Sequence, residues 1–145
     1  MNMRKRMSVL LAAVMLSTNI VPMGAIVMAE NQNAPKKAVK IVQTAGRDQL
    51  GTFAPDFAHY NDDILFGEVW SRNDKLSLHD RSIVTISGLI GSGVIDSSLK
   101  YHIATAKKNG VTKDEMVEII TQLGFYTGWP KAWAAFNMAK EVYAE

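Results

Sequence analysis

Four side chains within residues 66–102 combine charge or acid–base chemistry with apolar neighbours: Glu68, Arg72, Arg81 and His102. Charged groups leave water only when they have partners, because burying an unpaired charge costs several kcal/mol. An arginine in such a setting usually holds a carboxylate, which comes from its own chain or from a ligand. Together the four residues predict a small anion-binding pocket that contains a proton-transfer group.

Each of these residue types suits one part of an acid–base reaction on an anionic substrate. Arg72 and Arg81 carry guanidinium groups, which bind carboxylates through a two-pronged fork. Histidine has a reference pKa of about 6.5, so His102 can gain or lose a proton near neutral pH. Glu68 could orient that histidine, or act as the acid itself if burial raises its pKa. Trp70 follows Glu68 closely and is a candidate wall of the substrate site.

The sequence leaves a structural alternative open for each candidate. Arg81 could hold the fold by pairing with an acidic side chain or a helix end, and Arg72 could be a solvated surface residue. His102 could be a core histidine, because apolar residues recur around it at helical spacing. Trp70 could belong to the core or to a contact between subunits.

Thiol and metal chemistry are not predicted. The sequence contains no cysteine, which removes peroxidatic and disulfide-exchange mechanisms. Its three histidines lack the tight spacing to other ligands that marks a metal site, and His59 and His79 are expected at the surface. We therefore expect the protein to need neither a metal nor an organic cofactor.

The N-terminus has the features of a secretory signal peptide. Residues 4–6 are basic, residues 8–21 form an apolar run, and residues 27–29 place small or tolerated side chains at the −3 and −1 positions of a cleavage site. The apolar run is shorter than the ~20 residues that a spanning helix needs. We expect cleavage after Ala29 and a periplasmic or secreted protein without a stable membrane anchor.

Removal of residues 1–29 from the 145 leaves 116, which is enough for one domain. Three of the 16 basic residues lie in the leader, so the remainder carries 13 basic and 14 acidic residues. It has no Lys/Arg-rich patch with interleaved aromatic residues, so nucleic-acid binding is not expected. Residues 30–40 are largely polar, which predicts a flexible N-terminal tether over residues 30–42, and residues 43–145 form the predicted domain.

Apolar residues recur at helical spacing through this domain, and capping signals delimit the helices. Helices are predicted over residues 56–65, from 77 to the glycines at 91 and 93, and over residues 97–109, 112–127 and 130–143. Ser77 with Asp80, and Thr112 with Glu115, have the spacing of capping boxes. No segment shows sustained period-two alternation, so the fold is predicted to be an all-α compact bundle. Its apolar faces exceed what about 116 residues can bury alone, which predicts a homo-oligomer.

Five sequence blocks resemble, in order, the carboxymuconolactone decarboxylase family. They are Gly-Glu-Val-Trp-Ser-Arg (67–72), Leu-Ser-Leu-x-Asp-Arg-Ser-x-Val-Thr-Ile (76–86), Leu-Lys-Tyr-His-Ile (99–103), Asn-Gly-Val-Thr-Lys-Asp-Glu (109–115) and Tyr-x-Gly-x-Pro (126–130). The resemblance implies an all-helical subunit that assembles into trimers or hexamers. For the enzymes that give the family its name, it also implies decarboxylation of a carboxylated lactone in aromatic catabolism.

One branch of this family resembles the alkylhydroperoxidase partner proteins, which carry a Cys-x-x-Cys pair followed by a histidine on the same helix. Here the stretch upstream of His102 holds Ser97 and Ser98 and no cysteine. Without thiols the peroxidase-type cycle is not available, so the decarboxylase branch is the better match.

These observations predict an exported, cofactor-free carboxy-lyase that acts on a small carboxylated lactone or a related organic acid. His102 and Glu68 are its predicted catalytic residues, and Arg81, Arg72 and Trp70 are predicted to bind the substrate. Two alternatives stay open. One is a non-catalytic oligomeric protein that binds small anions, and the other is an oxidoreductase or detoxification role that rests on family analogy alone.

Overall fold

A computed structural model describes residues 37–144, and all of the regular secondary structure in this range is helical. The elements are α1 (Ala45–Leu50), α2 (Pro55–His59), the π-helical segment η2 (Tyr60–Trp70), α3 (Leu78–Ser92), α4 (Ser97–Lys108), α5 (Lys113–Thr127) and α6 (Trp129–Ala144). The prediction of an all-α domain is confirmed. The predicted signal peptide lies outside the described residues. Within them, no helix combines the length and the apolar character needed to cross a membrane.

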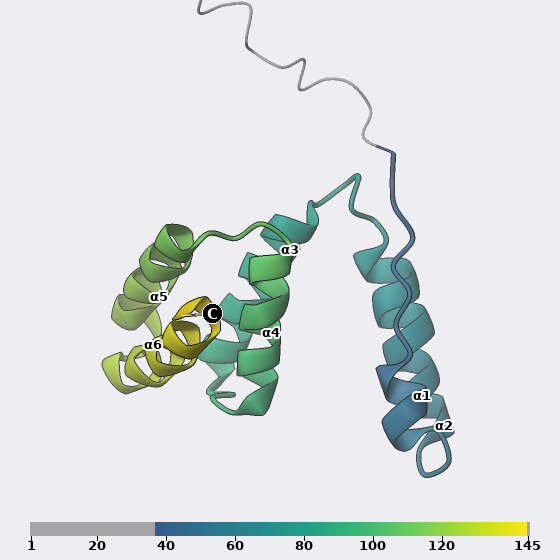
Figure 1. The fold of residues 1–145 in the computed structure, drawn as a ribbon. Helices are drawn as coiled ribbons and strands as arrows, with labels where there is room; N and C mark the ends of the chain where they lie inside the picture. The colour runs from purple at the N-terminus through teal and green to yellow at the C-terminus, as the bar shows by residue number, and fades with distance from the viewer. Residues whose placement is uncertain (1–36, 145) are drawn as a thin grey trace, which may run out of the picture. The chain divides into compact units, whose positions relative to one another are not determined.

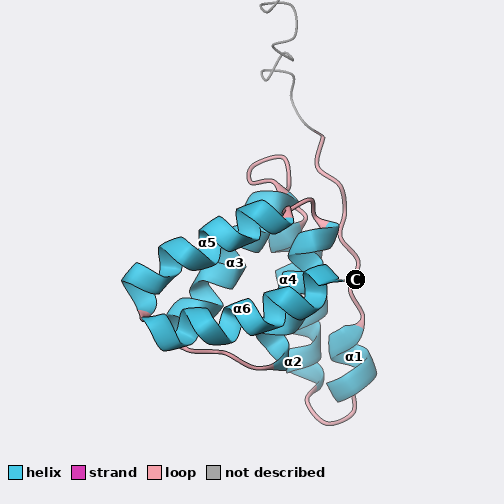
Figure 2. Cartoon of the chain, turned by 60° about the vertical axis from the view of Figure 1, so that its left-hand side comes forward, coloured by secondary structure: helices cyan, strands magenta, loops and turns pink. Residues whose placement is uncertain are grey.

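Helices α3 to α6 pack on one another and form the four-helix core of the protein (Figure 2). Ile86 and Ile90 of α3, Leu99 and Ile103 of α4, and Ile120 of α5 are fully buried in it. The buried face of α6 is built largely from alanines, whose small side chains let the neighbouring helices approach closely. The core therefore holds the side of α4 that carries Leu99 and Ile103. The opposite side of α4 remains available for contacts outside the core.

Local capping signals set the ends of these helices. The Ser77 hydroxyl accepts a hydrogen bond from the Asp80 N–H at 3.0 Å, and α3 ends at Gly93, which has a positive φ of 83°. At the start of α5, Thr112 and Glu115 form a complete capping box. The four helices predicted from residue 77 onward agree with the observed bounds to within two residues.

The elements α1, α2 and η2 form an N-terminal hairpin, which packs mainly within itself (Figure 1). Helix α2 runs directly into η2, so the helix predicted to end at residue 65 continues to Trp70. The short helix α1 was not predicted. The backbone preceding α1 contacts the segment that follows η2, where the Val39 N–H donates to the Asn73 side chain at 2.9 Å and the Ile41 N–H donates to the Ser71 hydroxyl at 2.8 Å.

A buried carboxylate, that of Asp62, joins the two arms of the hairpin. It accepts hydrogen bonds from the backbone N–H groups of Gly46 and Arg47, at 2.9 Å each, in the first turn of α1. Burial, the largest single effect, raises the pKa of Asp62, but these bonds and one from Asn61 outweigh it and leave that pKa below its usual value. A Cβ on Gly46 would lie 2.8 Å from Asp62 Oδ1, so the close approach requires glycine.

Candidate active site

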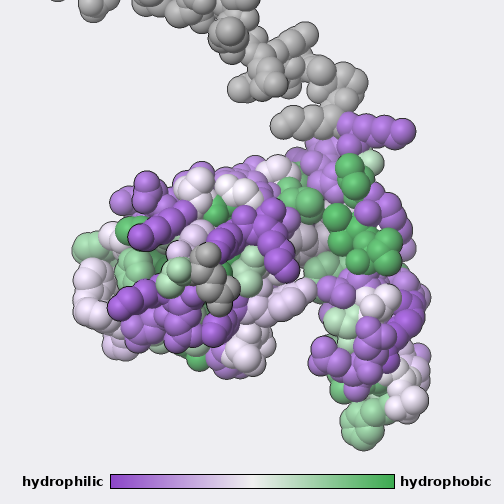
Figure 3. All heavy atoms as spheres, viewed as in Figure 1, coloured by the Kyte–Doolittle hydropathy of each residue, from purple (hydrophilic) through white to green (hydrophobic). Residues whose placement is uncertain are grey.

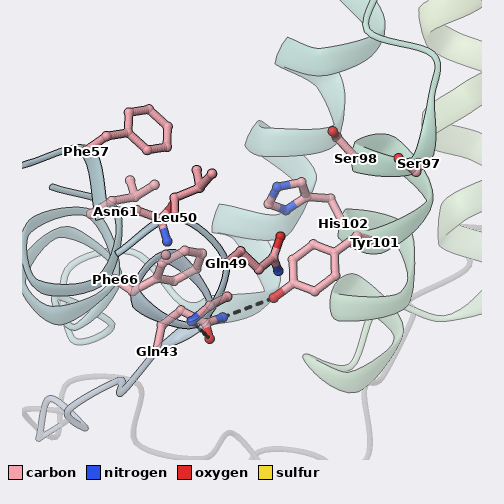
Figure 4. A pocket seen from close by; sticks show the side chains of 13 residues that line it. Gln43, Gln49, Leu50, Phe57, Asn61, Phe66, Ser97, Ser98, Tyr101 and His102 are labelled. Atoms are coloured by element: carbon pink, nitrogen blue, oxygen red, sulfur yellow. Dashed lines mark hydrogen bonds between the residues drawn. The ribbon is translucent and has the colours of Figure 1, made fainter. Parts of the chain in front are cut away.

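A cavity of about 480 Å³ lies between the hairpin and the first turns of α4 (Figure 4). Its volume is in the range of small-molecule sites. The segments up to η2 line it with apolar and amide side chains, chiefly Leu50, Phe57, Leu65, Phe66, Gln43, Gln49 and Asn61. Helix α4 lines it with Ser97, Ser98, Tyr101 and His102. Among the described residues that line the cavity, none is a lysine, arginine, aspartate or glutamate.

His102 is the titratable base of this cavity. Leu99 and Ile103 face the four-helix core. His102 lies at the edge of that buried face and lines the cavity together with Ser98, one turn earlier on the helix. The side chain is half-buried, and neither ring nitrogen has a hydrogen-bond partner within residues 37–144. Burial lowers the pKa of His102 below its usual value of 6.5. The neutral imidazole is therefore the main form at pH 7.

Tyr101 lies beside His102 and presents a hydroxyl to the cavity. The two rings meet edge to face, with centroids 5.2 Å apart. The Tyr101 hydroxyl accepts a hydrogen bond from Gln43 Nε2 at 3.2 Å (Figure 4). Gln43 Oε1 in turn accepts from the backbone N–H groups of Thr44 and Ala45, which fixes the orientation of the amide. Because Tyr101 acts as the acceptor in this contact, its own proton is left for another acceptor.

Glu68 and Trp70 lie away from the His102 cavity. Glu68 is exposed and lines a second, smaller cavity of about 270 Å³, together with Lys40 and Arg47. Trp70 is only 7% exposed and packs on Phe66, with ring centroids 5.7 Å apart. Burial of Glu68, the condition under which it could act as an acid, is not seen in the single chain, and Trp70 is buried in the hairpin and does not line the His102 cavity.

The two arginines contact each other, and neither lies in the cavity that contains His102. Arg72 is exposed in the loop between η2 and α3, and its carbonyl oxygen accepts a hydrogen bond from Arg81 Nη2 at 3.1 Å. Arg81 is half-buried, and its Nε is buried without a partner within the described chain. Neither arginine lines the His102 cavity. Of Glu68, Arg72, Arg81 and His102, only His102 lines this cavity of the single chain, and a shared site for the four residues stays a prediction.

Sequence reasoning missed Tyr101 and the amide and serine side chains of the cavity. One signal for part of this set was present, because Ser97 and Tyr101, and likewise Ser98 and His102, are spaced by four residues on one helix. The amides have no such local signal, since Gln43 precedes α1 and reaches Tyr101 across 58 positions of the sequence.

The other two histidines are held by carboxylates outside this cavity. His59 is exposed and lies 2.6 Å from Asp63. His79 lies between Asp80, at 2.9 Å, and Glu115, at 3.2 Å, and these carboxylates raise its pKa, with the Asp80 contact making the larger contribution. Within the part of the chain that the structure describes, no three His, Asp or Glu side chains are grouped as metal ligands would be.

Comparison with known proteins finds a matching family and similar individual proteins. The model of the carboxymuconolactone decarboxylase family matches residues 55–141, which run from the start of α2 into α6. The 4-carboxymuconolactone decarboxylase of Acinetobacter baylyi is 41% identical over 98 residues, which cover 68% of this chain and 72% of that protein. An uncharacterized 15.0 kDa protein of Paracoccus denitrificans is 30% identical over 84 residues, covering 57% of this chain and 62% of its own length.

Proposed function

This chain belongs to the carboxymuconolactone decarboxylase family, and on that premise we propose that it is a carboxy-lyase acting on a small carboxylated lactone or a related organic acid. The observation that carries the proposal is the His102 cavity, where an imidazole that has no hydrogen-bond partner among residues 37–144 faces apolar and amide side chains. The name of the Acinetobacter baylyi relative supports both the reaction class and a small-molecule substrate.

The proposed reaction has two steps. In the first, the bond between the lactone carbon and its carboxylate breaks, CO2 leaves, and the electron pair enters the conjugated lactone as an enolate. In the second, a proton moves from the His102 imidazolium to carbon, and the imidazole returns to its neutral form. The substrate carboxylate itself promotes protonation of His102, because a nearby negative charge raises the pKa of an imidazole.

Tyr101 is the proposed donor to the lactone carbonyl oxygen, where negative charge develops as CO2 leaves. Its hydroxyl proton is free because Gln43 donates to the same oxygen atom. A hydrogen bond received by a hydroxyl group also makes it a better donor. Donors aimed at the developing charge stabilise the transition state more than the ground state.

Replacement of Tyr101 by Phe tests this role. We expect kcat to fall roughly 10- to 100-fold, the effect of losing one hydrogen bond to a charged oxygen. The melting temperature should change little, because Tyr101 is 51% exposed. Tyr126→Phe is the matched control, since Tyr126 is exposed on α5 and does not line this cavity. Equal activity of Tyr101→Phe and wild type would remove Tyr101 from the mechanism.

The decisive experiment for the function is an assay of CO2 release and lactone absorbance with the purified protein and a panel of carboxylated lactones. The proposal expects equimolar CO2 and decarboxylated lactone from at least one member. Tight binding of panel members without CO2 release would support the alternative of a non-catalytic anion-binding protein. The roles predicted for Glu68, Arg72 and Arg81 stay predictions, and no step above depends on them.

We also propose that the working form is a homo-oligomer, a trimer or a hexamer. Large apolar side chains are exposed on the hairpin, such as Phe53 (88%) and Phe57 (60%), and hydrophobic side chains reach the surface there (Figure 3). Others are exposed at the end of α5 and on α6, where Phe125 is 78% and Trp133 63% exposed. Apolar patches of this kind mark interaction sites.

Light scattering at micromolar concentration should give a mass that is a multiple of the subunit mass. Trp133→Asp should lower that mass, because a carboxylate in an apolar contact loses its hydration. Lys140→Asp, at another exposed position of α6, should leave it unchanged. A wild-type protein of subunit mass would contradict the oligomer.

Export after cleavage at Ala29 is proposed on the sequence of residues 1–29 alone. N-terminal sequencing of the protein recovered from a cell envelope or culture medium should therefore begin at Glu30. An intact Met1 on cytoplasmic protein would argue against export.

A further inference from the structure

Residues 39–43, which precede α1, form a strap that is tied to the end of η2 and to the loop after it. The Asn73 side chain contacts Val39 twice. Its Oδ1 accepts from the Val39 N–H at 2.9 Å, and its Nδ2 donates to the Val39 carbonyl oxygen at 2.6 Å. The Ser71 hydroxyl accepts from the Ile41 N–H at 2.8 Å. The backbone ahead of α1 is therefore held at two points.

The last residue of the strap, Gln43, is also held from its other side. Its Oε1 accepts from the N–H groups of the next two residues, at 3.0 and 3.1 Å. The two N–H groups after those donate to the buried carboxylate of Asp62, at 2.9 Å each. Because the amide oxygen is already engaged, Gln43 Nε2 is directed at the Tyr101 hydroxyl, 3.2 Å away (Figure 4). The strap and the start of α1 thus set the position of the group that contacts Tyr101.

We propose that Asn73 is a positioning residue for the Tyr101 hydroxyl, and that it acts through the strap and Gln43. The catalytic part of this inference rests on the proposed function, in which Tyr101 donates to the lactone oxygen. Asn73 lines neither the His102 cavity nor the second cavity, so it does not touch the reacting atoms itself. A donor lowers the barrier only when it is aimed at the developing charge, and small displacements reduce the rate. The strap precedes residues 55–141, so the family match does not imply this contact.

The kinetic test is a double-mutant cycle between Asn73→Ala and Tyr101→Phe. Asn73→Ala removes both contacts with Val39 and should lower kcat about 3- to 10-fold, because the hydroxyl is then misaligned but still present. KM should change less than kcat, since the Tyr101 hydrogen bond is strongest in the transition state. In the Tyr101→Phe background, Asn73→Ala should change kcat by less than about twofold. Equal losses in the two backgrounds would show that Asn73 does not act through Tyr101.

A measurement without substrate separates this inference from the proposed function. The protein has four tyrosines, and NMR of protein isotopically labelled at the tyrosine Cζ assigns Tyr101 by its loss in Tyr101→Phe. Gln43→Ala removes the hydrogen bond to the hydroxyl and should shift this signal. Asn73→Ala should shift it in the same direction. An unmoved Tyr101 signal in Asn73→Ala would refute the positioning role, whatever the CO2 assay gives. A shifted signal without CO2 release from any lactone would refute only the proposed reaction.

Asn109→Ala is the matched control for both measurements. Asn109 Nδ2 donates to the Ser82 hydroxyl at 3.0 Å, and Asn109 lines neither of the two cavities. The control is stringent, because Asn109 ends the helix that carries Tyr101. Its loss should lower the melting temperature while leaving kcat and the Tyr101 signal of the folded protein unchanged. If Asn109→Ala moves kcat and the signal as far as Asn73→Ala does, the effect is general loosening of the fold and the inference fails.

Discussion

His102→Ala should lower kcat for decarboxylation by ~10²–10⁴-fold, the range for losing a positioned general acid. It should also weaken binding of the carboxylated substrate, because the substrate carboxylate is proposed to promote protonation of His102 and to pair with the imidazolium. The fold should survive, since the half-buried ring has no hydrogen bond within the described residues whose loss would leave a buried group unpaired. Steady-state kinetics and thermal melts on the same preparations provide the measurement.

His59→Ala is the matched control for that experiment. His59 is an exposed histidine that contacts Asp63 and does not line the cavity, so its removal should leave kcat and KM unchanged. If His102→Ala keeps full activity on a substrate that the wild type turns over, His102 is structural and the proton must come from another donor.

The helices of the four-helix core were predictable because residues close to each helix end determine where that helix begins or ends. The bounds of α5 follow from Thr112 and Glu115, whose side chains satisfy backbone groups only a few residues away. The end of α3 follows from Gly93, since a residue with positive φ is most easily glycine. Signals of this kind act over one helical turn, and a single sequence contains them in full.

The structure of the hairpin was less predictable because it depends on contacts between residues that are far apart in the sequence. Helix α1 has six residues, too few to be stable in isolation, and the amides of its first turn are satisfied by Asp62, 16 positions after Gly46. No stop signal marks the end of α2, so the chain continues through η2 to Trp70. A prediction made for each helix separately therefore finds neither the short helix α1 nor the continuation of α2 through η2.

The candidate site was predicted only in part, for reasons of geometry. A π-helix closes hydrogen bonds from i to i+5, so its turn is wider than the α-helical turn from which side-chain directions are normally inferred. Asn61, Leu65 and Phe66 face the cavity at spacings of four and five, whereas Glu68 lies on a different side of η2. His102 was singled out by its residue type, because the helical spacing of its apolar neighbours on α4 was equally compatible with a core histidine.

Leu99→Ala should produce the opposite pattern to His102→Ala, although the two residues are three positions apart on α4. Leu99 is fully buried in the four-helix core, so its truncation leaves a cavity and should lower the free energy of unfolding by about 2–5 kcal/mol. Equilibrium denaturation measures this loss. Ile103→Val, at a neighbouring buried position, removes one methyl group and should cost only about 0.5–1.5 kcal/mol.

Activity of the Leu99→Ala protein should be measured well below its melting temperature, where the chain is folded. We expect kcat there to stay within about tenfold of wild type, a loss smaller than the ~10²–10⁴-fold that removal of a general acid gives, because Leu99 faces the core and only the position of α4 links it to the cavity. A loss of kcat as large as that of His102→Ala in the folded protein would mean that small shifts of α4 misplace the imidazole. The helix would then act as a positioning element, and the inner face of α4 would contribute to catalysis as well as to stability.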